Sequence, residues 1–130
     1  MIIIYYKKEI GNEGEDFASD YLENNNYTVI ARNFTSKSGE IDIIALDYNV
    51  RPVEYVFIEV KTRKHFEFGK PAESVTKYKI KHIYKTAQYF LYKYKIKNVF
   101  CRFDVIEVYE MPNCNYKLKH IKKAIIDNVF

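Results

Sequence analysis

Apolar and polar positions along the first half of the chain predict one helix followed by three strands. Between residues 12 and 25, small and apolar side chains recur at three- and four-residue steps around one carboxylate, Glu15, which indicates a helix. Three asparagines at 24–26 end it. Runs rich in β-branched and aromatic residues at 27–34, 40–47 and 53–63 then alternate with short polar turns, so we expect a meander of three strands.

The second half predicts a long helix and one or two further strands. Pro71 indicates a helix start, and residues 72–95 repeat apolar side chains along one face. Residues 98–110 form a strong strand pattern, and residues 116–123 favour an extra terminal strand. A helix between the third and fourth strands can cross over one sheet face, while the first helix covers the same or the opposite face.

This element order, α-β-β-β-α-β with a terminal strand added, is typical of the α/β class, as a mixed β-sheet flanked by helices. The chain has 130 residues and shows no repeat or linker, so we expect a single domain over residues 1–130. Residues 1–10 are expected to be either a flexible arm or an additional strand.

Composition excludes several classes of protein. A hydrophobic fraction of 48% with 29% charged residues is typical of a folded soluble domain. The apolar run at residues 1–6 is too short for a signal peptide or a membrane span, so we expect a cytoplasmic protein with no membrane partner. Cys101 and Cys114 form no CxxC pair, which argues against a zinc or redox motif; a disulfide between them stays open.

Charge is distributed unevenly along the chain. Residues 1–69 hold 8 basic and 12 acidic side chains, whereas residues 70–130 hold 13 basic and 5 acidic ones. An acidic half beside a basic half suits a protein that binds a cation at one place and a polyanion nearby. A chance distribution of solvated surface charge explains the same numbers, so charge alone does not assign a function.

Candidate chemistry lies on the second and third predicted strands. Asp42 shares a strand face with Ile44, and Glu59 shares one with Lys61. Charged groups at the ends of apolar runs are costly unless they are paired or bind a metal. If the two strands are neighbours, Asp42 lies beside Glu59, and two close carboxylates favour Mg²⁺ or Mn²⁺.

Three further residues extend this pattern. Lys61 is placed to face a metal-bound water or the charge that develops on phosphorus. Glu15 and Lys79 each interrupt the apolar face of a helix; Glu15 could orient a water or a second ion, and Lys79 could contact a phosphate or hold a carboxylate. Each residue also has a structural alternative, because Glu-x-Lys pairs occur on half-exposed strands and Lys79 could extend to solvent from a helix edge. The pattern as a whole favours phosphodiester hydrolysis.

The same residues carry a family resemblance. An Asp followed by Glu59-Val60-Lys61 resembles the PD-(D/E)xK nuclease superfamily, which includes restriction enzymes and archaeal Holliday junction resolvases. Within it, the chain is similar to the YraN-like family of small bacterial proteins. The segments that carry this likeness are 11–18, 32–34, 39–45, 57–63, 68–71 and 102–106. The superfamily's proline before the first Asp is replaced here by Ile41, which removes no ligand.

The resemblance implies a restriction-endonuclease-like fold and a resolvase-like DNA endonuclease. It implies a catalytic set of Glu15, Asp42, Glu59 and Lys61, with the three carboxylates as metal ligands. It offers Arg63, Lys79 and Arg102 as weaker candidates for nucleic-acid contacts.

The basic second helix, which includes Lys77, fits a nucleic-acid partner, because outward lysines contact phosphates without reading sequence. The predicted function is therefore a Mg²⁺- or Mn²⁺-dependent DNA endonuclease that selects DNA structure, with DNA favoured over RNA. The alternatives are a nucleic-acid-binding protein that keeps the fold without turnover, and a protein-interaction module. A homodimer would suit a symmetric junction, but no dimer surface is evident in the sequence.

Overall fold

The computed structural model describes residues 13–69 and 77–124, apart from the side chain of Lys77. Its elements are α1 (Glu13–Asn24), β1 (Tyr27–Ser36), β2 (Gly39–Asp47), β3 (Glu54–Lys64), α2 (Lys77–Lys93), β4 (Phe100–Met111) and β5 (Asn115–Ile121). The predicted order is confirmed, including the extra terminal strand. The predictions for residues 1–10 and for a helix start near Pro71 lie outside the described residues.

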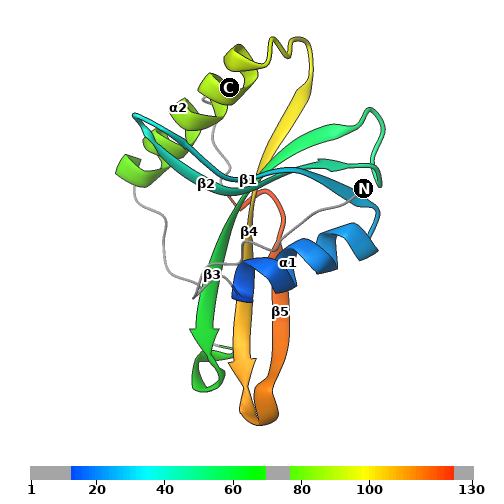
Figure 1. Ribbon diagram of the computed structural model, residues 1–130, viewed down its shortest axis with the longest axis vertical. Coiled ribbons are helices and arrows are strands. Elements are labelled where there is room, and N and C mark those ends of the chain that lie inside the picture. Colours follow the sequence, from blue (N-terminus) through cyan, green and yellow to red (C-terminus); the bar gives the residue numbers. More distant parts are fainter. Residues whose placement is uncertain (1–12, 70–76, 125–130) are drawn as a thin grey trace.

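The five strands of the described ranges form one mixed sheet in the order β1-β2-β3-β4-β5. Strands β1, β2 and β3 are antiparallel neighbours, β3 and β4 run parallel, and β5 returns antiparallel to β4. The parallel pair needs a crossover connection, and α2 supplies it. The mixed sheet flanked by helices that the sequence predicts is therefore confirmed (Figure 1).

The two helices cover opposite faces of the sheet (Figure 1). On the α1 side, Ala18 and Leu22 pack in one buried cluster with Ile58. On the α2 side, Phe90 packs in a second cluster with Phe57. Phe57 and Ile58 point to opposite sides because successive strand residues alternate, so each helix buries its own set of side chains.

Helix α1 approaches the sheet most closely at Gly14. A Cβ atom there would lie 2.5 Å from the Thr62 Oγ1 atom and 3.8 Å from the Val108 Cβ atom. The missing side chain therefore lets the first turn of α1 rest directly on β3 and β4. That contact fixes the position of the next residue, Glu15.

A buried ion cluster ties the strands together around Arg102. Its Nη1 atom lies 2.8 Å from Asp47 Oδ2 and 2.9 Å from Glu54 Oε1, and both Nε and Nη2 lie 2.9 Å from Asp104 oxygens. The guanidinium also donates to Tyr27 Oη at 3.1 Å. Arg102 is only 6% exposed, so the structure places its guanidinium in the core, away from the surface where the predicted nucleic-acid contact would form. It is a structural cation.

The ion cluster lowers the pKa of two of its carboxylates, Asp47 and Asp104. Burial alone would raise the pKa of Asp104, but hydrogen bonds from His120, Arg102 and the Lys123 N–H outweigh burial and bring it below the ordinary value. The pKa of Asp47 is lowered in the same way, by hydrogen bonds from Asn49 and Arg102 that outweigh burial. These two carboxylates are therefore stable in the ionised form inside the protein.

Two smaller observations complete the fold. Both cysteines, Cys101 and Cys114, are free thiols, so the disulfide left open by the sequence does not form. Within residues 13–69 and 77–124, no helix is long and apolar enough to span a membrane.

Replacing Arg102 should destabilise the fold strongly at neutral pH. Arg102→Met leaves Asp47 and Asp104 charged and buried without their cation, and we expect a loss of about 3–5 kcal/mol in the free energy of unfolding at pH 7. The folded pKa values of both carboxylates lie below the ordinary 3.8, so the stability they contribute exists above that pH and is lost as pH falls through the folded values. The deficit of Arg102→Met should therefore shrink between pH 7 and pH 3, as measured by urea unfolding.

Lys119→Met is the matched control, because Lys119 is an exposed cation on β5. It should change the unfolding free energy by no more than about 0.5 kcal/mol. Equal stability of the two variants at pH 7 would contradict the structural role of Arg102.

Candidate active site

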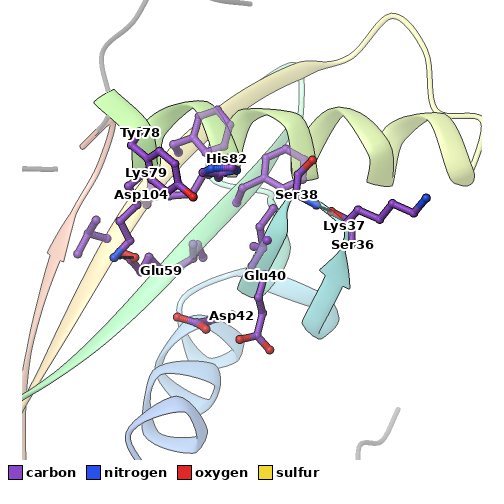
Figure 2. Close-up of a pocket in the computed structure, with 17 residues that line it drawn as sticks. Ser36, Lys37, Ser38, Glu40, Asp42, Glu59, Tyr78, Lys79, His82 and Asp104 are labelled. Atoms are coloured by element: carbon purple, nitrogen blue, oxygen red, sulfur yellow. Dashed lines mark hydrogen bonds and ion pairs between the residues drawn. The ribbon is translucent and has the colours of Figure 1, made fainter. Parts of the chain in front are cut away.

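A cavity of about 690 Å³ lies between α2 and the sheet. It is lined by residues from the β1–β2 turn, β2, β3, α2 and β4 (Figure 2). Its side chains that carry charge or an imidazole ring include Lys37, Glu40, Asp42, Glu59, Lys79 and His82. Three residues predicted from the sequence, Asp42, Glu59 and Lys79, therefore meet in one cavity.

Asp42 occupies the point where β2 separates from β3. The two strands pair only as far as Ile43 and Ile58. Beyond that pair, Asp42 Oδ2 accepts a hydrogen bond of 2.8 Å from the Val60 N–H. The carboxylate thus satisfies a β3 donor that the β2 backbone no longer reaches, and this holds Asp42 between the strands.

The alternation of side chains is interrupted around Asp42. Ile43 packs in the α1-side cluster and Ile44 in the α2-side cluster, as alternation requires. Ile41 should share the face of Ile43, yet it belongs to the α2-side cluster, and both Ile41 and Asp42 line the cavity. Because β2 leaves its neighbour here, two consecutive residues face one cavity.

The surroundings of Asp42 disfavour its charge. Burial raises the pKa of Asp42 to about 6, the hydrogen bond from Val60 opposes that rise, and the negative charges of Glu15, Glu59 and Glu40 add to it. A carboxylate in this position is stabilised by any cation that enters the cavity.

Glu59 is held by two lysines. Its Oε1 atom lies 2.7 Å from Lys79 Nζ, and its Oε2 atom lies 3.9 Å from Lys61 Nζ. The prediction that Lys79 holds one of the carboxylates is confirmed. Lys61 is not among the residues that line the cavity; it stands beside Glu59, two residues further along β3.

Glu15 reaches the site from the other helix. Its Oε1 atom is buried, lies 3.5 Å from Arg32 Nη2 and accepts no hydrogen bond within the described part of the chain. Burial raises the pKa of Glu15, although Arg32 and Asn33 oppose the rise. Arg32 also pairs with Asp16 at 2.9 Å, so this arginine positions the first turn of α1. Glu15 lines no part of the cavity and acts on Asp42 through its charge.

The other two predicted nucleic-acid contacts are Arg63, which does not line the cavity, and Lys77, whose side chain is not among those that the structure describes. The Arg63 guanidinium is 3.7 Å from Glu107, a buried carboxylate that also accepts a hydrogen bond from Tyr109. The structure therefore places Arg63 against the sheet rather than toward a ligand. The side chain of Lys77 lies outside the described residues, so its predicted contact stays a prediction.

Sequence reasoning missed three of these cavity side chains, Lys37, Glu40 and His82. The His82 ring meets Tyr78 edge to face at 4.1 Å between ring centres, and its Nδ1 atom is buried without a hydrogen-bond partner in the described ranges. His82 lies three residues after Lys79, so helical spacing could have found it. Glu40 lies two residues before Asp42 on β2 and adds negative charge to it.

The carboxylates suit a hard divalent cation by chemistry. No group of three Asp, Glu, His or Cys side chains in the described ranges is close enough to bind a metal ion by itself. Mg²⁺ does not require one, because it usually takes one or two carboxylates and completes its shell with waters and phosphate oxygens. Asp42 and Glu59 supply that number in one cavity, and burial first, then the neighbouring carboxylates, raise the pKa of Asp42, so a cation there would stabilise its charged form.

Comparison with known proteins shows which family the chain resembles. The pattern of the family described as "Uncharacterised protein family UPF0102" matches residues 14–108. A UPF0102 protein of Clostridium botulinum (strain Loch Maree / Type A3) is 50% identical over 122 residues, which cover 92% of this chain and 96% of the relative. A UPF0102 protein of Caldicellulosiruptor saccharolyticus is 42% identical over 124 residues, which cover 95% of this chain and 98% of the relative.

Neutralising Asp42 should stabilise the metal-free protein. The folded pKa of about 6 lies above the ordinary 3.8, so the cost of ionising Asp42 is fully present above pH 6, declines as pH falls, and vanishes below about pH 4. Asp42→Asn keeps an acceptor for Val60 and removes the charge. We expect a gain of about 1–2 kcal/mol at pH 8, discounted for partial exposure, and almost none at pH 4.

Urea unfolding in EDTA at both pH values measures this gain. Asp20→Asn is the control, because Asp20 is exposed on α1 and its variant should be neutral at both pH values. An equal loss of stability in Asp42→Asn at pH 8 and pH 4 would show that the charge is not the destabilising element.

Proposed function

Because the chain belongs to the UPF0102 family, and its cavity combines paired carboxylates with lysines, we propose that it is a metal-dependent nuclease of the PD-(D/E)xK kind that hydrolyses phosphodiester bonds in DNA. One observation carries the proposal. Asp42 and Glu59, from two adjacent antiparallel strands, line one cavity, with Lys61 and Lys79 beside Glu59.

In this proposal, Asp42 and Glu59 would hold a Mg²⁺ or Mn²⁺ ion. When bound, the ion would supply positive charge that activates a water and stabilises the phosphate oxygens. Lys61, whose ammonium stands 3.9 Å from Glu59, offsets negative charge on the reacting phosphate and orients the attacking water. Glu15, whose Oε1 atom lies 3.5 Å from Arg32 outside the cavity, would contribute negative charge near Asp42.

Lys79 has a separate role in this mechanism. Its ammonium lies 2.7 Å from Glu59 and therefore neutralises the carboxylate that a metal cation would also bind. When the substrate phosphate arrives, Lys79 can transfer its hydrogen bond from Glu59 to a phosphate oxygen, because its side chain is half exposed. Glu59 is then left to the cation.

Charge distribution supports a polyanionic substrate on the α2 side. Helix α1 carries five acidic and no basic side chains, whereas α2 carries five lysines and no acidic ones. The helices lie on opposite faces of the sheet, so a nucleic acid is attracted to the face where the cavity lies and repelled from the other (Figure 1). A resolvase-like reaction on branched DNA in the cytoplasm, with a homodimer acting on a symmetric junction, is the finer form of the proposal.

A second function has one observation in its favour. Lys79 already neutralises Glu59, and the described carboxylates do not form a three-ligand group. A protein that binds nucleic acid through this face without turnover would have the same features. It predicts DNA binding that persists in EDTA and is unchanged by Asp42→Ala.

Cleavage of labelled DNAs tests the nuclease. Duplex, single-stranded, flapped and four-way-junction DNAs are incubated with Mg²⁺ or Mn²⁺, and we expect cutting by the wild type on at least one of them. Asp42→Ala and Lys61→Ala should each reduce the rate by about 10²-fold or more, because each removes charge stabilisation from the transition state. Lys119→Met should cut at the wild-type rate.

Circular dichroism and melting temperature must show that the variants remain folded. Binding without cleavage by a folded wild type would support the second function and contradict the nuclease. Equal activity of Asp42→Ala and the wild type would contradict the assignment of the active site to this cavity.

Lys79→Gln separates the two roles of Glu59. Removing the ammonium should tighten Mn²⁺ binding several-fold, because the lysine and the metal compete for one carboxylate. Titration of Mn²⁺ followed by electron paramagnetic resonance measures the affinity directly. Asp42→Asn should weaken binding, Lys119→Met should leave it unchanged, and weaker binding by Lys79→Gln would argue against a cation at Glu59.

A further inference from the structure

The outer face of α2 carries large aromatic rings in solvent. Tyr78 is 74% exposed, Tyr89 is 44% exposed and Tyr92 is 81% exposed. Single exposed aromatic residues are ordinary on protein surfaces, but several on one helix form a surface that suits a ligand. Tyr89 also packs against Phe34 of β1, with 6.0 Å between ring centres. The more exposed Tyr78 and Tyr92 therefore need an account beyond the packing of the fold.

The rings and two lysines lie on one stripe of the helix. An α-helix turns about 100° per residue, so Tyr89, which follows Tyr78 by 11 residues, returns to within about 20° of its direction. The other members deviate by no more than about 60° to the other side. We name this set the α2 stripe: Tyr78, Lys81, Lys85, Tyr89 and Tyr92. At about 1.5 Å per residue it is roughly 21 Å long.

The chemistry of the stripe matches a single strand of nucleic acid. Base faces stack on aromatic rings whatever the sequence, and lysines contact the phosphates between them. The bases of a duplex already stack on each other and leave no face for Tyr78 or Tyr92. Helix α2 has no acidic side chain that would repel the backbone. We infer that the α2 stripe binds a single-stranded segment of nucleic acid, by stacking its bases and contacting its phosphates.

The stripe is continuous with the cavity. Tyr78 belongs to both, and it lines the cavity together with Lys79 and His82 (Figure 2). Tyr78 and His82 also meet edge to face, which connects the end of the stripe with the cavity wall. A strand stacked along α2 is led toward Asp42 and Glu59. If the proposed nuclease function holds, on which this consequence rests, the substrate is DNA with a single-stranded arm, such as a flap or a frayed branch.

Fluorescence tests the stacking contact directly. The chain contains no tryptophan, so Tyr92→Trp introduces a single reporter on the stripe. The control is Tyr48→Trp, because Tyr48 is 45% exposed in the turn after β2 and lies outside the stripe. Both variants are titrated in EDTA, where a metal-dependent reaction is absent, with oligothymidine and with a duplex of equal length. We expect quenching of Tyr92→Trp by oligothymidine alone, and none of Tyr48→Trp.

Affinity measurements on the same oligonucleotides provide the second arm. Tyr78→Ala and Tyr92→Ala should each weaken single-strand binding about five- to tenfold, because each removes one stacking platform. Lys85→Ala should reduce the slope of log K against log salt by about 0.7, while the tyrosine variants keep that slope. Lys119→Met should change neither quantity.

Three results would overturn the inference. The first is equal affinity of the wild type for duplex and single strand, and the second is equal quenching of both tryptophan variants. The third is a wild type that binds no oligonucleotide but self-associates, with the self-association abolished by Tyr92→Ala, because the stripe would then contact a second copy of the chain. The cleavage assay tests the proposed nuclease function separately from these binding measurements. If the wild type binds single strands through the stripe but shows no metal-dependent cleavage, the proposed function is rejected and this inference is kept. If Tyr78→Ala and Tyr92→Ala still cleave DNA and still bind single strands normally, only this inference is rejected.

Discussion

The buried contact between Arg102 and its carboxylates is the interaction on which the sheet depends. It joins the end of β2, the start of β3 and the middle of β4, with Asp47, Glu54 and Asp104 as partners. A buried guanidinium with this many charge-assisted hydrogen bonds tolerates little displacement. With these strands held together there, β2 can part from β3 beyond Ile43 without opening the sheet, and the cavity forms at that parting.

The fold treats the charges of two acidic groups, Asp104 and Asp42, in opposite ways. Asp104 has its own cation and hydrogen-bond donors, and its pKa is lowered. Asp42 has one backbone donor and three negative neighbours, and its pKa is raised to about 6. In the proposed function, a cation beside Asp42 would offset the cost of this charge. Lysines approach Glu59 rather than Asp42, so the cavity is asymmetric, with an acidic side and a basic side.

Much of the fold and part of the site followed from residue spacing. Strand alternation and helical periodicity depend on local geometry, so the element order and the positions of Asp42 and Glu59 on adjacent strands could be predicted. The burial of Arg102 could not be predicted, because the sequence pattern of a strand does not show whether an arginine in it pairs with buried carboxylates or faces solvent. His82 was missed for a similar reason: its importance comes from the turn before β2, which packs near it only in the folded chain.

The sequence by itself determined which chemical groups are present and in what order: two strand carboxylates, a lysine two residues after the second, an acidic first helix and a lysine-rich second helix. Tertiary structure decided which of these groups meet. It brought Lys79 onto Glu59, buried Arg102, and set Asp42 where β2 leaves β3. The physical reason is that periodicity is a property of neighbouring residues, whereas charge interactions and burial depend on distances between segments far apart in the chain.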